Sequence, residues 1–545
     1  MNQEVSADLV LRNARITTFD SEVPTAESIA IRDGRVLAIG SDEELAALAE
    51  TAARTIDLGG RSVLPGLNDS HIHAVRGGVG WGTCLQWEGI RSQAEALASV
   101  REAVAARAPG EWISVIGGWH ERQFSDAGMP TREQLDEIAP VHPVYLQELY
   151  GRAVLNSAAL TAVGWDDDTQ PPPGAEFLRD DDGRLTGEVR GPAAYARPNA
   201  LTLDLPLETA VQATASMTSE FAAHGLTGVV DAGGFQVTPH DYDALYELWR
   251  RGGLGVRFRL YICAWSRGDE VHDYEQLTLL SQPDFGDGML KIAGLGEMPH
   301  MACHDFEGFD PDFTIADDAH SELVEICRMA VEHGWRLSVH AVLNNSLSRI
   351  LDAWELVDRE SGGRVSELRW SIVHADEASE ENLRRIAALR AGIQVQNRMV
   401  LQGADYVDLW GQDGADAAPP IGAMKRLGIQ IGAGTDGTRA NSWYPWTSIA
   451  WLVSGESIDR RTRRAEHDRL SRFDAIAAYT RDSAWFSGEE DTRGRLAPGF
   501  DADLCVPTMD PFSCSIEELR ELRSELTMVG GRITHAAPAF TELVG

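Results

Sequence analysis

Eight short apolar runs with strand character recur along this chain, and segments with helical character separate most of them. The runs cover residues 62–67, 226–231, 256–263, 289–293, 336–340, 370–374, 393–396 and 429–433. Strands that alternate with helices form parallel sheets, whose buried strands are apolar along their whole length. Because eight such units close a barrel, the sequence predicts an α/β fold, a (β/α)8 TIM barrel with reactive groups at the carboxyl ends of its strands.

The two ends of the chain follow a different pattern, with short strands separated by Gly, Asn and Asp turns. Isolated hairpins are marginally stable, so we expect residues 1–62 and 490–545 to form one small β-sandwich domain. The barrel domain then covers 63–489. About 160 residues separate its first two runs, whereas a strand–helix–strand unit needs roughly 30. We therefore expect residues 74–205 to be an insertion over the barrel mouth.

Composition narrows the function classes. The 545 residues carry a formal net charge of −36, which repels nucleic-acid phosphates and anionic membrane surfaces. No apolar run is long enough to span a membrane, and the first residues are polar and acidic. Six scattered cysteines without a Cys-x-x-Cys pair indicate reduced thiols. We expect a cytoplasmic protein that acts on a small molecule, and self-association into a homo-oligomer stays open.

Residue types that bind metal ions stand at the ends of these runs. His71 and His73 follow the first run, and residues i and i+2 of a strand point the same way. His340 and His374 end the fifth and sixth runs, and Asp436 follows the eighth. A closed barrel brings these ends around one axis. Neutral imidazole and carboxylate are ligands for zinc-like ions, so the sequence predicts a metal centre there.

Lysine is nearly absent from the chain, whose 48 basic residues include only Lys291 and Lys425 as lysines. Lys291 lies inside the fourth apolar run. A neutral amine can react with carbon dioxide to form a carbamate, whereas a guanidinium stays protonated and cannot. Lys291 is therefore a candidate for a lysine that forms a carbamate, and the alternative is a lysine salt-bridged within the barrel.

Motifs along nearly the whole chain resemble the amidohydrolase superfamily, in particular its large-insertion branch that includes N-substituted formamide deformylase-like enzymes. These motifs lie at residues 65–73, 118–119, 130–136, 156–160, 339–341, 374–375, 434–436, 479–481 and 494–504. The chain departs from the branch after the fourth run, where residues 293–297 read Ala-Gly-Leu-Gly-Glu and the usual Asp-Gly is absent.

The resemblance implies a ligand set for one or two divalent ions, most readily zinc. His71, His73 and Asp436 would hold the first ion, His340 and His374 the second. A carboxylated Lys291 would bridge the two. In a version with one ion, Lys291 would only neutralise charge.

The implied mechanism is hydrolysis by a water molecule that a bound ion makes more acidic. Asp436 would take the proton of this water and pass it to the leaving nitrogen. His374 or an ion would polarise the carbonyl group.

Other residues are candidates for contact with a substrate. Trp119 and Trp443, with further tryptophans near the predicted mouth, favour an apolar or aromatic substrate portion, unless they belong to the core. Arg152 and Arg439 could bind a carboxylate, or they are ordinary surface arginines. The triplet of His300, Cys303 and His304 has helical spacing and could form an accessory metal site, or it is simply part of a loop.

Three functions fit these observations. The leading hypothesis is a metal-dependent hydrolase of a C–N, amide-type bond in a small substrate. The second is a decarboxylase or another metal-dependent C–C lyase on the same scaffold. The third is a non-catalytic binding relative, which the intact set of ligand-type residues disfavours.

Overall fold

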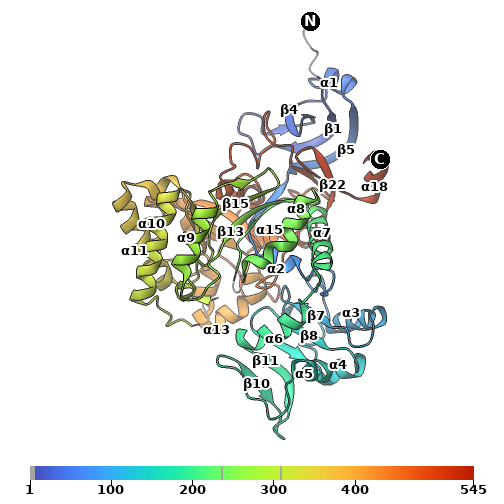
Figure 1. Ribbon diagram of the computed structural model, residues 1–545. Helices are drawn as coiled ribbons and strands as arrows, with labels where there is room; N and C mark the ends of the chain where they lie inside the picture. Colours follow the sequence, from blue (N-terminus) through green and yellow to red (C-terminus); the bar gives the residue numbers. More distant parts are fainter. Residues whose placement is uncertain (1–5, 235–236, 307–309, 545) are drawn as a thin grey trace.

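The centre of the molecule is a barrel of eight parallel strands (Figure 1). The structure is a computed structural model that describes residues 6–234, 237–306 and 310–544. Hydrogen bonds connect the strands in sequence order from the first to the last. The barrel strands are β6 (Leu67–Ile72), β12 (Leu226–Asp231), β13 (Arg257–Ile262), β15 (Leu290–Leu295), β16 (Arg336–Ala341), β17 (Ser371–His374), β18 (Gly392–Gln396) and β19 (Gln430–Gly434).

The first and last strands meet through the buried carboxylate of Asp69. The Thr435 hydroxyl donates to Asp69 at 2.6 Å, and the amide of His71 donates to it at 2.9 Å. The Asp436 amide in turn donates to the carbonyl of His71 at 2.9 Å. The expected (β/α)8 barrel is therefore confirmed, and its closure places the residues after β6 and β19 side by side.

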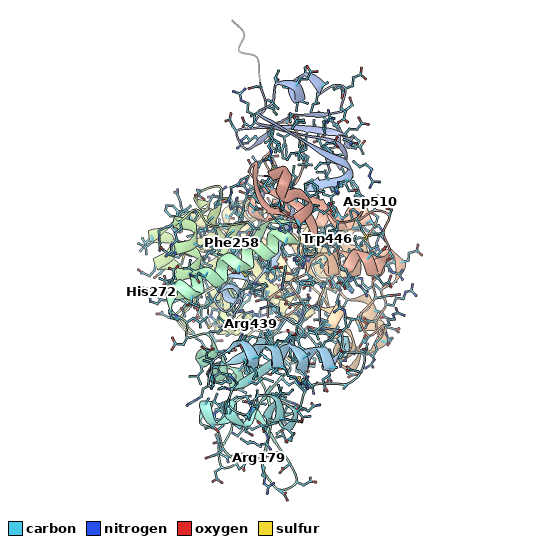
Figure 2. All side chains as sticks on the ribbon, turned by 90° about the vertical axis from the view of Figure 1, so that its right-hand side faces the viewer. Arg179, Phe258, His272, Arg439, Trp446 and Asp510 are labelled. Carbon is cyan, nitrogen blue, oxygen red and sulfur yellow. The ribbon has the colours of Figure 1, made fainter. Side chains whose placement is uncertain are left out.

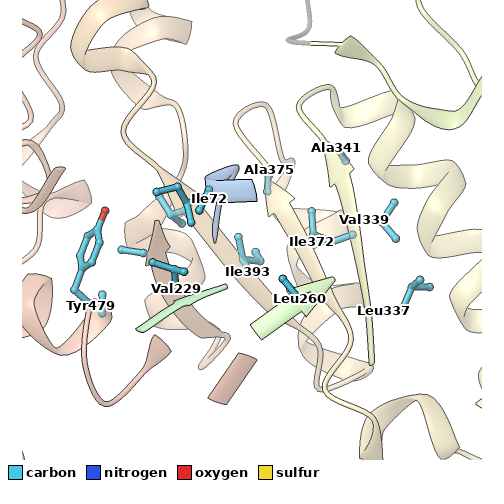
Figure 3. Packing of buried hydrophobic residues seen from close by; sticks show 14 of the residues in the cluster. Ile72, Val229, Leu260, Leu337, Val339, Ala341, Ile372, Ala375, Ile393 and Tyr479 are labelled. Carbon is cyan, nitrogen blue, oxygen red and sulfur yellow. The ribbon is translucent and has the colours of Figure 1, made fainter. Parts of the chain in front are cut away.

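Apolar side chains of the strands form the barrel core (Figure 3). Val229, Leu260, Leu337, Ile372 and Ile393 come from five different strands, and each is completely buried. Because these apolar side chains are closely packed, they hold the ends of the strands at fixed positions.

Helices surround the barrel. Buried residues at helical spacing explain which face of each helix packs inward; in α11 they include Leu347, Ile350, Leu351 and Trp354. These helices are α2 (Ala74–Gly78), α7 (Leu207–Ala223), α8 (Asp243–Arg250), α9 (Glu270–Leu280), α10 (Asp317–His333), α11 (Asn344–Ser361), α12 (Glu380–Ala388), α13 (Met399–Ala417), α14 (Ile421–Arg426), α15 (Pro445–Ser454) and α16 (Arg472–Ala478). In the part of the chain that the structure describes, no helix has both the length and the apolar character needed to cross a membrane.

The first barrel strand differs from its prediction. Residues 62–65 end the long strand β5 (Arg54–Pro65) of the small domain, and β6 begins only at Leu67. Gly66 separates the two strands, and a Cβ atom there would lie about 2 Å from the Thr227 side chain. The sequence of β6, Leu-Asn-Asp-Ser-His-Ile, is mostly polar although every residue in it is buried. An apolar pattern therefore cannot locate this strand.

The two chain ends build one β domain. Strand β5 pairs with β1 (Leu9–Thr17) over most of its length and with β20 (Leu504–Pro507) at its end. The remaining strands are β2 (Thr25–Ala26), β3 (Ser28–Arg32), β4 (Arg35–Gly40), β21 (Ser524–Val529) and β22 (Arg532–Ala536). Side chains from both ends, such as Leu11 and Leu526, share one apolar cluster. The short helices α1 (Ala46–Thr51), α17 (Ile516–Arg520) and α18 (Pro538–Val544) belong to the same two terminal segments.

The long segment after β6 forms a separate five-stranded sheet with four helices, at the opposite end of the molecule from the β domain (Figure 1). Its strands are β7 (Ile113–Ile116), β8 (Val144–Glu148), β9 (Arg152–Leu155), β10 (Glu176–Arg179) and β11 (Leu185–Arg190), and its helices are α3 (Gln93–Ala106), α4 (Arg132–Ile138), α5 (Ser157–Val163) and α6 (Pro192–Thr202). Arg122 donates to Asp405 of α13 at 2.7 Å. The insertion therefore packs on segments that follow the carboxyl ends of the barrel strands.

One carboxyl group of this insertion is buried without a partner. Glu88 is 6% exposed, and neither side-chain oxygen has a hydrogen-bond partner in another described residue. Burial raises the pKa of Glu88 to about 8, because water no longer solvates the charged form.

We expect Glu88 to make the stability of the protein depend on pH. The pKa in the folded state exceeds that in the unfolded chain, so the folded state binds more protons between about pH 4.5 and pH 8. The contribution of Glu88 to stability is therefore highest below that window and falls by up to about 5 kcal/mol across it. Melting temperatures at pH 5 and pH 8.5 test this, because Glu88→Gln should flatten the decrease. An equal decrease in wild type and variant would contradict it.

Candidate metal centre

Three ligand-type side chains meet where β6 and β19 end. The Nε2 atom of His73 lies 3.1 Å from Oδ1 of Asp436, and Nε2 of His71 lies 3.6 Å from the same oxygen. All three side chains are almost completely buried. Asp436 has a φ of +57°, in the left-handed region that non-glycine residues rarely adopt. Such backbone strain concentrates at functional sites.

Glu297 connects these residues to a second group. It follows β15, and its Oε1 lies 3.3 Å from Nε2 of His73, while its Oε2 lies 3.4 Å from Nε2 of His71. The same Oε2 lies 3.5 Å from Nδ1 of His340. Nε2 of His374 lies 2.9 Å from that Nδ1 atom. One carboxylate thus contacts imidazoles from both halves of the cluster, the arrangement a bridging ligand needs.

Neighbouring groups fix which nitrogen of two histidines faces the cluster. Nδ1 of His73 lies 2.9 Å from the carbonyl oxygen of Gly233, and Nε2 of His340 lies 2.9 Å from Oδ1 of Asp305. The carbonyl oxygen of Gly233 can only accept, so Nδ1 of His73 carries a proton. Nε2 of His73 and Nδ1 of His340 are the nitrogens that face Glu297. Supporting acceptors of this kind are usual behind histidine metal ligands.

The electrostatics of the cluster favour ionised carboxylates. Burial alone would raise the pKa of Glu297 and of Asp436, but the adjacent histidines hold both values well below the usual range. Burial and the positive field of His340 keep the pKa of His374 well below its ordinary value, so this imidazole is neutral. Two carboxylates in a buried ring of imidazoles present a negative, low-dielectric site that attracts a cation.

The unsatisfied atoms of this cluster test whether it fits a metal ion. Six of its buried atoms have no hydrogen-bond partner among the described residues. They are Nδ1 and Nε2 of His71, Oε2 of Glu297, Nε2 of His340, Nδ1 of His374 and Oδ2 of Asp436. Buried polar atoms seldom stay unpaired unless an ion or water serves them. Three triplets of side chains have ligand atoms within 4.8 Å of one another, and they are His71, His73 and Asp436; His71, Glu297 and His374; and Glu297, His304 and His340. Imidazoles and carboxylates grouped in this way fit one or two divalent ions.

Lys291 lies outside this group, which corrects the bridging role expected from the sequence. It is the second residue of β15, and its Nζ atom pairs with Glu489 at 3.0 Å. Arg259 and Arg493 bind the same carboxylate. Because β15 continues to Leu295, the residue delivered to the cluster comes two positions after the strand end and is Glu297. The salt-bridge alternative for Lys291 describes its observed contact.

The three residues of the expected accessory site, His300, Cys303 and His304, have different surroundings. His300 contacts Glu322 at 2.8 Å and accepts a hydrogen bond from the Ala302 amide at Nδ1. Cys303 is buried, which raises the pKa of its thiol to about 12. The ring of His304 stacks on His340 with centroids 3.8 Å apart, so it lies beside the main cluster. These three residues do not converge on a common point.

A large cavity of about 720 Å³ lies between the insertion and the barrel. Its lining includes Tyr150 and Arg152 from the insertion and Phe306 and Asp405 from the barrel segments. The Phe306 ring contacts both Tyr150, at 5.6 Å between centroids, and His304, at 5.9 Å. Through His304 the cavity wall continues to His340. The expected position of the insertion over the mouth gives this cavity one of its walls.

The three substrate-binding residues predicted from the sequence have other partners. Trp119 is buried in the insertion core, where it packs on Trp87 and Phe124 and donates to the carbonyl of Gln147 at 2.9 Å. Trp443 is 2% exposed and packs among aromatic rings of the barrel core. Both tryptophans are therefore core residues, and the alternative stated for them is the better description.

Arg152 lines the large cavity but is already neutralised. Its guanidinium pairs with Glu121 at 2.6 Å and with Glu148 at 2.9 Å. Two carboxylates leave no excess positive charge for an anionic ligand, so the structure does not favour Arg152 as a carboxylate receptor.

The parallel barrel and its buried cluster of histidines and carboxylates define a metal-dependent hydrolase of the TIM-barrel type, and comparison with known proteins agrees. The sequence pattern of the Amidohydrolase family matches residues 54–535. The chain therefore belongs to the amidohydrolase family, and the enzyme class predicted from the sequence, a metal-dependent amidohydrolase acting on carbon–nitrogen bonds, is confirmed.

Individual relatives are distant but cover the whole length. The chain is 26% identical to an N-substituted formamide deformylase of Arthrobacter pascens, over 96% of this chain and 97% of the relative. A metal-dependent hydrolase from Pyrococcus horikoshii superposes with a TM-score of 0.67 at 20% identity, covering 93% of this chain and 99% of that one. Atrazine chlorohydrolase from Arthrobacter aurescens, solved with zinc, gives 0.55 at 17% identity over 98% of both chains. These structures support the fold.

Proposed function

We propose that this protein hydrolyses a C–N, amide-type bond of a small, partly apolar substrate, with one or two zinc ions as cofactor. The observation that carries the proposal is the contact of Glu297 with His71, His73 and His340, beside Asp436. The relative named as a formamide deformylase supports the choice of bond, and the zinc in the chlorohydrolase structure supports the choice of metal.

The donor atoms divide into two sets that share Glu297. His71, His73 and Asp436 would hold one ion, and His340 and His374 would hold the other. When bound, a divalent ion lowers the pKa of a water molecule toward neutrality and polarises a carbonyl oxygen. With a single ion, the first set offers the closer contacts to a carboxylate.

Asp436 is placed to move the proton. Its pKa lies well below the usual range, so the carboxylate is ionised at neutral pH and can accept a proton from water. Its Oδ2 atom has no hydrogen-bond partner among the described residues, whereas Oδ1 faces His71 and His73. We assign Oδ2 to take the proton of the attacking water and to return it to the leaving nitrogen. His374, held neutral, supports the developing charge on the carbonyl oxygen.

The large cavity beside His304 is the place for the substrate body. Its volume of about 720 Å³ is within the range for small-molecule sites. Aromatic side chains of Tyr150 and Phe306 form part of its wall, which suits an apolar or aromatic portion. The six cysteines form no disulfide, which agrees with our placement of this activity in the reducing cytoplasm.

Removal of the metal is expected to abolish turnover. Protein treated with a chelator should lose formate release from N-benzylformamide, and addition of zinc should restore it. Metal analysis of the same samples gives the number of ions per chain. Product analysis separates the reaction classes, since hydrolysis yields an amine and an acid while decarboxylation yields carbon dioxide. Full activity in metal-free protein, or release of carbon dioxide, would refute the proposal.

A further inference from the structure

Two arginines beside the metal centre share a small polar cavity without an acidic partner. Arg76 lies on α2, three residues after His73, and Arg439 lies three residues after Asp436. Both line a cavity of about 20 Å³, together with Trp81, Cys84, Gln86 and Thr438. This volume has room for one to two water-sized groups, about the size of the two oxygens of a carboxylate. Figure 2 shows Arg439 at the level where the barrel meets the insertion.

Neither guanidinium is neutralised within the described part of the chain. Arg76 is 9% exposed; its Nη2 donates to the Tyr150 hydroxyl at 2.6 Å, and its Nε atom has no partner. The Arg439 side chain makes no hydrogen bond or ion pair with any described residue. The carboxylate of Asp231 influences Arg76 electrostatically, but it accepts from the amides of Val75 and Gly233 instead.

This arrangement differs from that of Arg257 and Arg259, two buried arginines of the same chain. Arg257 and Arg259 each bind both oxygens of a carboxylate, at 2.8–2.9 Å. Burial and the charge of Arg76 lower the pKa of Arg439 to about 10, so the Arg439 guanidinium remains charged at neutral pH. Arg76 is buried and Arg439 is half-buried, and two adjacent cations of this kind cost free energy unless an anion joins them. The uncompensated pair therefore indicates a missing anionic ligand.

The backbone around the pair places it within reach of a substrate at the metal centre. A Cβ atom on Gly234 would lie 3.0 Å from Nδ1 of His73 and 3.4 Å from Nη1 of Arg76, so this guanidinium lies close to a metal-binding imidazole. Gly117 of the insertion approaches the Arg439 backbone so closely that a Cβ atom would clash. Tyr150, which accepts from Arg76, lines the large cavity, so the small and large cavities are neighbours.

We infer that Arg76 and Arg439 bind a carboxylate group of the substrate, so that the enzyme acts on N-acyl or N-formyl compounds that carry an acid near the scissile bond. The inference rests on the proposed function and narrows it. Guanidinium groups suit this role because their forked donors match the two oxygens of a carboxylate. The small cavity takes the acid, and the large one takes the rest of the molecule.

Two probes that differ only in this group test the inference. N-formylphenylalanine carries the carboxylate, and N-formylphenylalanine amide is neutral at the same position. With zinc-loaded protein, kcat/KM for formate release and Kd by calorimetry should both favour the acid by at least tenfold. Arg439→Met and Arg76→Met should reduce this preference to within about twofold. Arg250→Met, which removes one positive charge from α8 where Arg250 pairs with Glu247, is the control and should retain it.

The outcomes separate this inference from the proposed function. Equal binding of acid and amide to the wild-type protein, or absence of binding by both, overturns the arginine site without any variant. Formate release from both probes at equal rates overturns it while the hydrolase assignment stands. Preferential binding of the acid without formate release supports the arginine site and counts against the deformylase-type activity. Arg439→Lys keeps the positive charge but removes the forked donors of the guanidinium. We expect its preference for the acid over the amide to lie between those of the wild type and Arg439→Met.

Discussion

Asp436→Asn is expected to lower kcat by about 10³-fold or more while the protein retains part of its metal. The amide side chain still offers an oxygen toward His71 and His73, so the donor set is weakened rather than removed. It cannot accept a proton at neutral pH. Loss of the base therefore acts on turnover more strongly than on metal content. Steady-state kinetics with a formamide substrate, together with metal analysis of the same preparation, measures both quantities.

A matched control comes from a carboxylate outside the cluster. Asp482 pairs with Arg481 after α16 and contacts none of the metal-binding side chains. Asp482→Asn changes the net charge equally and should leave kcat within about threefold. If Asp436→Asn kept a near-native kcat, proton transfer would belong to another group. If the Asp436→Asn protein lost all of its metal, Asp436 would be an essential metal ligand. The loss of turnover would then follow from the loss of metal and not from the loss of a base.

The sequence predicted the architecture well because barrel strands are apolar on both faces. The runs at 226–231 and 336–340 match β12 and β16 to within a residue. It failed at β6, where Asn68, Asp69 and Ser70 are buried yet polar. Their burial depends on partners distant in the sequence, such as Thr435 for Asp69. No local pattern contains that information.

The site was predictable where a residue type directly ends a strand. His340 and His374 lie within β16 and β17, and their rings contact each other in the cluster. Tryptophan gives no such signal, because a ring in a core and a ring in a pocket have the same local sequence. Trp119 and Trp443 were therefore misassigned. For Glu297 a signal existed: an acidic residue closely follows an apolar run, as Asp436 follows 429–433.

Separate substitutions of Glu297 and Lys291 should show which of the two side chains bridges the metal ions. Glu297→Gln is expected to weaken metal binding by about 100-fold or more, since outer-shell changes alone cost 10–100-fold and this carboxylate contacts the ligands directly. Turnover should fall with metal occupancy. The physical reason is charge: a neutral amide cannot balance the ions that four imidazoles and Asp436 would surround. Titration of metal-free protein with zinc gives the affinity.

Lys291→Met is the matched comparison, because it alters the same strand without altering the cluster. Glu489 keeps Arg259 and Arg493 when the lysine is removed. Lys291 is partly exposed, so loss of its ion pair should cost only about 1 kcal/mol or less of stability. Metal content and kcat should stay near the wild-type values, and extra bicarbonate should change neither. A carbamate on Lys291 would predict the reverse: loss of metal in Lys291→Met, and activity that depends on bicarbonate. Since a six-residue separation along β15 and its following loop places Lys291 and Glu297 in different surroundings, only one of these two patterns can hold.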